Sequence, residues 1–219
     1  MKKISKTWIY PTLILVVLLI TVCSCKESKT TIIASETGRF TDPRDGKIYK
    51  TVKIGEQWIM SENLAYKPDQ GNYWAYDNDT NNVASYGYLY DWETAKKIAP
   101  EGWHLPTREE WSVFHKSLGG RNFHLSKNSK SITTKYEKLI AGGSSGFNAL
   151  FGGKCYKNGE LFEQLGKIGD FWSSTGSVDG PYLYFVAKPN SLFNNKKGIA
   201  GLKNYNNSTG GKSVRLFRD

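Results

Sequence analysis

Cysteine is scarce in this chain. Three of its 219 residues are cysteines, and Cys23 and Cys25 both lie near the N-terminus, so Cys155 is the only one in the remainder. The remainder therefore cannot form an intrachain disulfide, and a zinc site built from several cysteines is excluded there. We expect the folded part to depend on its hydrophobic core for stability.

A hydrophobic run long enough to cross a membrane is also lacking. Residues 13–22, apolar apart from Thr21, are fewer than the roughly 20 that a spanning helix needs. Three lysines precede this run, and Cys23-Ser24-Cys25 follows it. A basic stretch, an apolar run and small residues in this order are typical of a secretion signal, so we predict a lipoprotein signal peptide over residues 1–24. A permanent membrane helix is the alternative.

Cys25 stands where bacterial lipoprotein signal peptides are cut and the new terminal cysteine is lipidated, because Val22 occupies position −3 and the small Ser24 position −1. Acyl chains on Cys25 would hold the protein to a bilayer surface, since each buried methylene adds about 0.8 kcal/mol of membrane affinity. We predict a lipid anchor in the outer membrane, facing either the cell surface or the inner side. Ordinary cleavage that leaves both cysteines without a role is the alternative.

Negative charge is in the minority. The chain has 30 lysines and arginines against 20 aspartates and glutamates, a formal net charge of +10. Such an excess permits attraction to anionic glycans, lipids or nucleic acid but requires none of them. Many lysines fall in the tail and in loops, so a solvated basic surface is the simpler interpretation. Because an exported protein does not meet nucleic acid, we predict no nucleic-acid partner.

Residues 25–39 and 40–219 differ in composition. The first range is polar, with Ile32-Ile33 and Ala34 as its only residues to bury, and we predict a flexible tether there. Order is expected to begin near Phe40. The second range should then form one folded domain.

Short strands bounded by turn residues are expected to dominate this domain. Ile48–Ile54 alternates as a half-buried strand does, and Gly55-Glu56 turns the chain into a second strand, Gln57–Met60. The residues on one side of the first strand are Ile48, Lys50, Val52 and Ile54. Further strand candidates are Lys154–Tyr156 with residues 161–162 around an Asn-Gly turn, and residues 171–175, 182–187, 199–203 and 213–217.

Two helices flank the segment Gly102-Trp103-His104-Leu105-Pro106. Thr107 can cap a helix and Glu110, three residues on, can close a capping box. The apolar residues of this helix recur at intervals of three and four: Trp111, Phe114 and Leu118. Gly119-Gly120 supplies the end of the helix. The other helix is expected over residues 92–98, before Pro100. Short strands around two helices predict a mixed α+β fold.

Several of these segments form a recognisable set. They include Tyr86-Gly87-Tyr88-Leu89-Tyr90-Asp91-Trp92, Gly102-Trp103-His104-Leu105-Pro106-Thr107 with Glu110-Trp111, Gly146-Phe147-Asn148-Ala149-Leu150, Phe171-Trp172-Ser173-Ser174-Thr175 and Ser213-Val214-Arg215, after the hairpin residues 45–64. The set resembles the Fibrobacter succinogenes major paralogous domain, found in secreted and lipid-anchored proteins of Fibrobacteres and Bacteroidetes. The resemblance covers nearly all of residues 40–219.

That family is similar to the C-type lectin-like fold, and its Leu-Pro-Thr-x-x-Glu-Trp segment is similar to one in formylglycine-generating enzymes. The resemblance implies two helices, small and mostly antiparallel sheets, and long loops. It implies no established activity. Formylglycine-generating enzymes use two cysteines to hold copper, whereas Cys155 stands alone here, so that chemistry lacks its metal site.

No other residue pattern indicates catalysis. The three histidines have no motif that ties them to a serine or to a metal-ligand spacing: His104, His115 and His124. We interpret His104 as a structural histidine. Glu109 and Glu110 are adjacent and point to different sides of a helix, so helix-start charge and capping explain them better than a carboxylate pair. We predict a protein that is not an enzyme and holds no cofactor.

Calcium is a weak possibility in one polar loop. Asp77, Asp79 and Asn81 place oxygen side chains at alternate positions, which suits a hard cation. The loop lacks the glycine and the distal glutamate of an EF-hand, and the Glu-Pro-Asn and Gln-Pro-Asp signatures of sugar-binding lectins are absent. A polar loop without metal is the preferred interpretation.

Aromatic residues carry the binding hypothesis. Residues 63–85 are expected to form a long irregular loop, and loops of this length are often functional. The loop contains four aromatic rings: Tyr66, Tyr73, Trp74 and Tyr76. These rings can stack on sugars or anchor a protein interface, or they can belong to the core. We predict a non-catalytic binding domain for an extracellular glycan or protein partner. A structural or assembly component of the outer envelope, without a small-molecule ligand, is the alternative.

Overall fold

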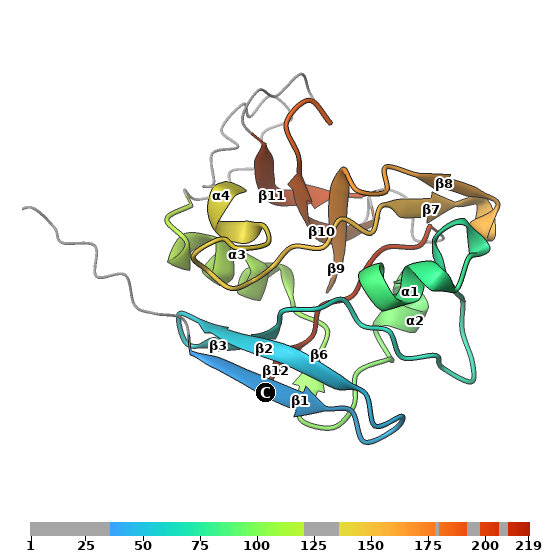
Figure 1. Cartoon of the computed structure of the whole chain (residues 1–219), viewed down its shortest axis with the longest axis horizontal. Coiled ribbons are helices and arrows are strands. Elements are labelled where there is room, and N and C mark those ends of the chain that lie inside the picture. The colour runs from blue at the N-terminus through green and yellow to red at the C-terminus, as the bar shows by residue number, and fades with distance from the viewer. Residues whose placement is uncertain (1–35, 121–135, 178–179, 192–197, 206–209) are drawn as a thin grey trace, which may run out of the picture. The chain divides into compact units, whose positions relative to one another are not determined.

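The computed structural model describes residues 36–120, 136–177, 180–191, 198–205 and 210–219 (Figure 1). The predicted signal peptide, Cys25 and most of the predicted tether lie outside these ranges, as does His124. Within the described ranges, none of the helices has the length and apolar character needed to cross a bilayer. The fold there is mixed α+β with several small antiparallel sheets, as predicted.

The first sheet grows from the predicted hairpin. Strands β2 (Ile48–Ile54) and β3 (Gln57–Met60) pair antiparallel, and Gly55 in the turn between them has a φ of 63°, which glycine adopts without strain. β12 (Phe217–Arg218) pairs with β3 and with β6 (Trp103–His104). The order of the sheet is β1-β2-β3-β12-β6.

The edge strand of this sheet corrects the predicted domain boundary. β1 (Thr37–Thr41) pairs antiparallel with β2 and places Phe40 opposite Tyr49. Residues 37–39 are therefore part of a strand and not of a flexible tether. Their polar composition suits an exposed edge strand, because only one of its neighbours is another strand.

Strand β2 buries residues on both of its sides. Val52 pairs with Ile59 and both lie in one hydrophobic cluster, whereas Tyr49 faces the other way and is fully buried in a second cluster. Ile48, on the side predicted to be buried, is 54% exposed. The sequence pattern suggested one buried face, but the sheet is covered on both faces over part of its length.

A second sheet of three strands supplies most of the remaining core. β9 (Ile168–Ser177), β10 (Gly180–Ala187) and β11 (Ile199–Asn204) are antiparallel in the order β11-β10-β9, with Tyr184 opposite Phe171. These strands confirm three of the predicted ones. In the view of Figure 1 this sheet lies above the five-stranded sheet, and α3 and α4 lie beside it.

The helix α3 (Arg108–Ser117) forms as its sequence predicts. The Thr107 side chain accepts a hydrogen bond from the Glu110 backbone N–H, and Glu110 accepts one from the Thr107 backbone N–H, which closes the capping box. The three apolar positions of one face are buried: Trp111, Phe114 and Leu118. Gly119, with a φ of 82°, ends the helix.

The other predicted helix is shorter than expected. α2 (Trp92–Ala95) is a single turn capped by Asp91, whose side chain accepts a hydrogen bond from the Thr94 backbone N–H. The predicted end at Ile98 is wrong, because the chain leaves the helix after Ala95. The smaller helix α4 (Tyr136–Leu139) packs against β10.

Residues 63–85 are more regular than the sequence suggested. They contain β4 (Tyr73–Trp74), the 3-10 turn η1 (Tyr76–Asn78) and most of α1 (Asn81–Tyr86). β4 pairs with β5 (Leu89–Tyr90), which lies beyond the predicted loop. The sequence pattern does not predict this pairing, because a strand of two residues is too short to show an alternation of apolar and polar residues.

The C-terminal third contains one further hairpin. β7 (Lys154–Tyr156) and β8 (Leu161–Glu163) pair across the turn η2 (Lys157–Gly159), as predicted. Most of the predicted strand 213–217 is not a strand: Ser213 forms an isolated bridge with Phe171, and pairing within a sheet resumes only at Phe217. The segment between them is instead buried among both sheets.

Candidate functional site

Three of the four predicted ligand-binding rings are packed into the domain. Tyr76 is only 8% exposed, and its ring lies 5.2 Å from that of Phe162. Tyr73 is half-buried with its ring 5.1 Å from Tyr88, and Trp74 packs beside a hydrophobic cluster around Tyr76. Tyr76 is thus buried, whereas Tyr73 and Trp74 keep part of their surface exposed.

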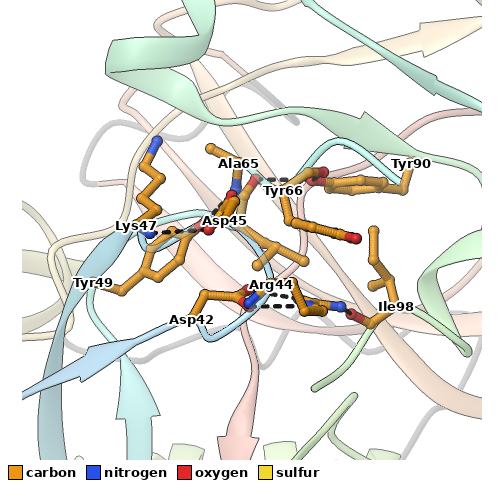
Figure 2. A network of polar contacts seen from close by, with 10 residues as sticks. Asp42, Arg44, Asp45, Lys47, Tyr49, Ala65, Tyr66, Tyr90 and Ile98 are labelled. Carbon is orange, nitrogen blue, oxygen red and sulfur yellow. Dashed lines mark hydrogen bonds and ion pairs between the residues drawn. The ribbon is translucent and has the colours of Figure 1, made fainter. Parts of the chain in front are cut away.

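Tyr66 has a different position. Its ring lies against the guanidinium of Arg44, with 3.7 Å between the guanidinium carbon and the ring centroid. Its backbone carbonyl accepts a hydrogen bond of 2.7 Å from the Tyr90 hydroxyl, which fixes the start of the following loop. Figure 2 shows Arg44 and Tyr66 next to each other, with Ile98 beside Arg44. Tyr66 lines a pocket that does not include Tyr73, Trp74 or Tyr76.

The pocket is a concave site with a volume of about 490 Å³. Three separate segments form it: Arg44 from the β1–β2 turn, residues between 66 and 72, and residues between 91 and 98 around α2. Pockets that hold small molecules usually have volumes of about 300 to 1,000 Å³. The size therefore suits a small ligand such as one or two sugar rings.

Arg44 ties the first of these segments to the last. Its Nε and Nη2 donate to the two carboxylate oxygens of Asp42 at 2.8 and 2.6 Å, and Nη1 donates to the Ile98 carbonyl at 2.5 Å (Figure 2). Burial alone would raise the pKa of Asp42, but the hydrogen bonds and charge of Arg44 hold it below its ordinary value. Both groups stay charged near neutral pH, so this wall of the pocket is rigid.

Hydrogen bonds also join the loop to α2. The Asp91 carboxylate accepts from the Asn72 side chain at 2.8 Å and from the Thr94 backbone N–H at 2.8 Å. The Thr94 hydroxyl in turn accepts from the Asn72 backbone N–H at 2.9 Å. Gly71, with a φ of 99°, lies so close to Thr94 that a Cβ at this position would clash. The pocket wall is therefore formed by a loop pressed closely onto the helix.

The pocket lining offers hydrogen-bonding groups and charged side chains, among them Asp91, Glu93 and Lys97. It contains no cysteine or histidine, and the hydroxyl of Thr94 already accepts a backbone hydrogen bond. The arrangement can bind and orient a polar molecule.

The predicted weak calcium ligands do not converge. Asp77, Asp79 and Asn81 are all exposed, and the Asp79 carboxylate accepts a hydrogen bond from the Asn81 backbone N–H within its own turn. The described ranges contain no group of three or more His, Cys, Asp or Glu side chains placed to hold a metal ion.

His104 lies between two carboxylates. Its Nδ1 is 2.5 Å from Asp219 and its Nε2 is 2.8 Å from Glu110. Burial would lower its pKa, but these hydrogen bonds raise the pKa above the ordinary value. Because both ring nitrogens face acceptors, the protonated imidazole fits best. His104 thus joins β6, α3 and the residue after β12, which agrees with the structural interpretation.

Cys155 is buried and forms no disulfide with any residue in the described ranges. Burial raises the pKa of its thiol to about 11, so the reactive thiolate is rare at neutral pH. A catalytic role for this cysteine therefore has no support in its surroundings.

Lys212 is a buried charged residue that sequence reasoning did not identify. Its Nζ lies 4.4 Å from the ring centroid of Tyr205, 4.9 Å from Tyr156 and 5.6 Å from Trp172. Burial lowers its pKa to about 8. The rings offer cation–π stabilisation to a charge buried away from water. Lys212 does not line the pocket beside Tyr66.

Sequence reasoning found one wall of the pocket and missed the others. The loop that contains Tyr66, Gln70 and Asn72 was expected to contact a ligand, and part of it does line the pocket. Arg44 and Lys97 were missed. Asp42-Pro43-Arg44 has the residue types of a turn, and no signal in the sequence relates it to Ile98, which lies 54 positions later.

Comparison with known proteins identifies one family. The sequence model of the Fibrobacter succinogenes major domain matches residues 52–217. The match includes the loop and α2 but begins after Arg44. No curated protein matches the chain, and no solved structure does.

Proposed function

The chain belongs to the Fibrobacter succinogenes major domain family, and from this membership and the pocket beside Tyr66 we propose a non-catalytic binding domain on a lipid-anchored envelope protein. The observation that carries the proposal is the pocket itself. It is concave, has a volume of about 490 Å³ and is lined by polar side chains from three separate segments. Sites of this kind orient ligands with a few well-placed polar groups.

A glycan outside the cell is the ligand that this lining favours. Arg44, Gln70 and Asn72 present planar polar groups, which match the paired hydroxyls of a sugar ring. Tyr66 adds an aromatic edge beside them. A flat protein surface would be the expected contact area for a protein partner, whereas this site is a pocket. A structural or assembly role in the envelope is the alternative.

The finer description of the fold is part of this proposal. We interpret the arrangement as C-type lectin-like, because α2 and α3 accompany several small antiparallel sheets joined by long connections. The lipid anchor at Cys25 and attachment to the outer membrane are proposed from the residues around the cleavage position alone.

Filling the pocket with a large side chain should weaken ligand binding. The full chain, purified from membranes, is applied to a glycan array, and its hits are measured again with Gln70→Trp, which places a large ring in the pocket. Gln70 is exposed, so the variant should fold normally. We expect at least a tenfold loss of affinity, about 1.4 kcal/mol.

Glu56→Trp is the matched control, because Glu56 is an exposed residue in the β2–β3 turn and does not line the pocket. It should bind as the wild type does. Absence of any glycan binding by the wild type would favour the structural role. Equal binding by Gln70→Trp would place the site elsewhere, with Trp74 as the next residue to change.

The anchor has a separate test. Radiolabelled palmitate should be incorporated into the wild type and into Cys23→Ser, but not into Cys25→Ser, because only Cys25 stands at the cleavage position. The Cys25→Ser protein should also be released from the membrane fraction. Equal labelling of Cys25→Ser and the wild type would refute lipidation at this residue.

A further inference from the structure

The carboxylates at the pocket are already engaged. Asp42 binds Arg44 through both oxygens, and Asp91 accepts hydrogen bonds from Asn72 and Thr94. Glu93, at the pocket rim, forms an ion pair of 2.8 Å with Lys96. A ligand that approaches this pocket therefore meets carboxylates that already have hydrogen-bonded or ion-paired partners within the chain.

The donors at the same pocket have capacity to spare. A guanidinium has five N–H groups, and Arg44 uses three of them, on Asp42 and Ile98. Lys97 is exposed, lines the pocket, and forms no ion pair with any residue in the described part of the chain. Its ammonium has three donors and no compensating carboxylate.

Resting on the binding function proposed above, we propose that the pocket's ligand carries an anionic group, and that Lys97 and the remaining N–H groups of Arg44 hold it. The class of ligand is an acidic glycan, with the charge on a sugar carboxylate or a sulfate ester. Both groups are compact and accept several hydrogen bonds, and guanidinium and ammonium groups bind such acceptors through charge-assisted hydrogen bonds.

The position of Arg44 strengthens this assignment. The guanidinium is held on one edge by Asp42 and on its flat face by Tyr66, so it is oriented before a ligand arrives. Preorganised donors bind more tightly because less conformational freedom is lost on binding. Lys97 directly precedes Ile98, whose carbonyl Arg44 contacts, and in this proposal Lys97 determines whether a charged or an uncharged sugar is preferred.

The test compares chemically matched ligands. Binding of the full chain to oligogalacturonate, to its methyl ester and to a sulfated oligosaccharide is measured by calorimetry. The methyl ester has the same sugar rings without the charge. We expect the acidic forms to bind about 10 to 100 times more tightly than the ester, the range expected for a hydrogen bond to a charged group. Their binding should weaken as salt is raised.

Two exposed lysines provide the variants. Lys97→Met should remove the preference for the acidic ligand and leave the affinity for the ester unchanged, and Lys97→Arg should restore most of the preference. Lys116→Met is the control, since Lys116 is exposed on α3 and does not line the pocket. Comparing the affinities for oligogalacturonate and for the sulfated oligosaccharide shows whether the site prefers a carboxylate or a sulfate.

The outcomes separate this inference from the proposed function. Equal binding of the acid and its ester by the wild type overturns the anionic ligand and leaves the glycan-binding pocket intact. A preference that survives Lys97→Met overturns the role of Lys97. If glycans of neither kind bind in this assay or on the array, the proposed function itself fails.

Discussion

Replacing Arg215 with methionine should lower the free energy of unfolding by about 4 kcal/mol or more. The guanidinium is fully buried and donates four hydrogen bonds of 2.7 to 2.9 Å. Its acceptors are the Asn63 side chain and the backbone carbonyls of Met60, Phe147 and Asn148. Methionine fills a similar space but donates nothing, and each buried acceptor left unpaired costs about 1 to 3 kcal/mol.

Arg215 remains charged in this position. Burial lowers its pKa to about 9, which is still above neutral pH, and the aromatic faces of Phe147 and Phe171 lie 4.8 and 5.4 Å from its guanidinium carbon. Lysine should not replace it, because a compact ammonium cannot reach four acceptors arranged around a planar fork. We therefore expect Arg215→Lys to be destabilised as well.

Urea unfolding followed by circular dichroism measures this effect. Arg218→Met is the control: Arg218 is exposed and lies over the Trp58 ring, so its loss should change stability by less than about 1 kcal/mol. A loss below about 1 kcal/mol for Arg215→Met would show that the four acceptors find other partners.

Replacing Trp111 with alanine should cost about 3 to 5 kcal/mol. The indole is fully buried and stacks on Tyr184 at 4.8 Å between ring centroids, with Phe217 at 4.9 Å and Phe114 at 5.4 Å. Its Nε1 donates to the Trp172 carbonyl at 3.2 Å. These residues come from α3 and from both sheets, so the cavity would lie where all three meet.

The thermal midpoint and the urea midpoint should both fall for Trp111→Ala. Trp58→Ala is the comparison, because Trp58 is only half-buried and its loss leaves a smaller cavity. We expect Trp111→Phe to recover part of the lost stability, since a phenyl ring fills part of the space. Equal losses for Trp58→Ala and Trp111→Ala would mean that α3 is not central to the core.

Local features were predictable because their causes lie within a few residues. The capping box of Thr107 and Glu110 forms inside one helical turn, and the turns at Gly55 and Asn158 join strands that are neighbours in the sequence. The family was also recognisable, because its motifs are short segments whose order could be compared directly, and the match to residues 52–217 confirms it.

Features that depend on distant segments were not predictable. The edge strand β1 looks like a polar tether until β2 supplies its hydrogen bonds, and Ile48 looks like a core residue until the sheet is seen to bury Tyr49 instead. Arg215 lies in a segment predicted as a strand, yet its role depends on acceptors up to 155 positions away. Propensity and periodicity contain no information about such partners.

The same division applies to the candidate site. Sequence alone determined that this chain has one cysteine beyond its first 25 residues, no evident catalytic motif, and a ring-rich stretch after residue 63 that deserved study as a binding surface. Only the tertiary structure decided which ring borders this pocket, since Tyr66 lies beside Arg44 and the other three rings are not part of its lining. The physical reason is that a pocket exists only where separate segments meet, and burial and hydrogen bonding across those segments decide which donors remain available to a ligand.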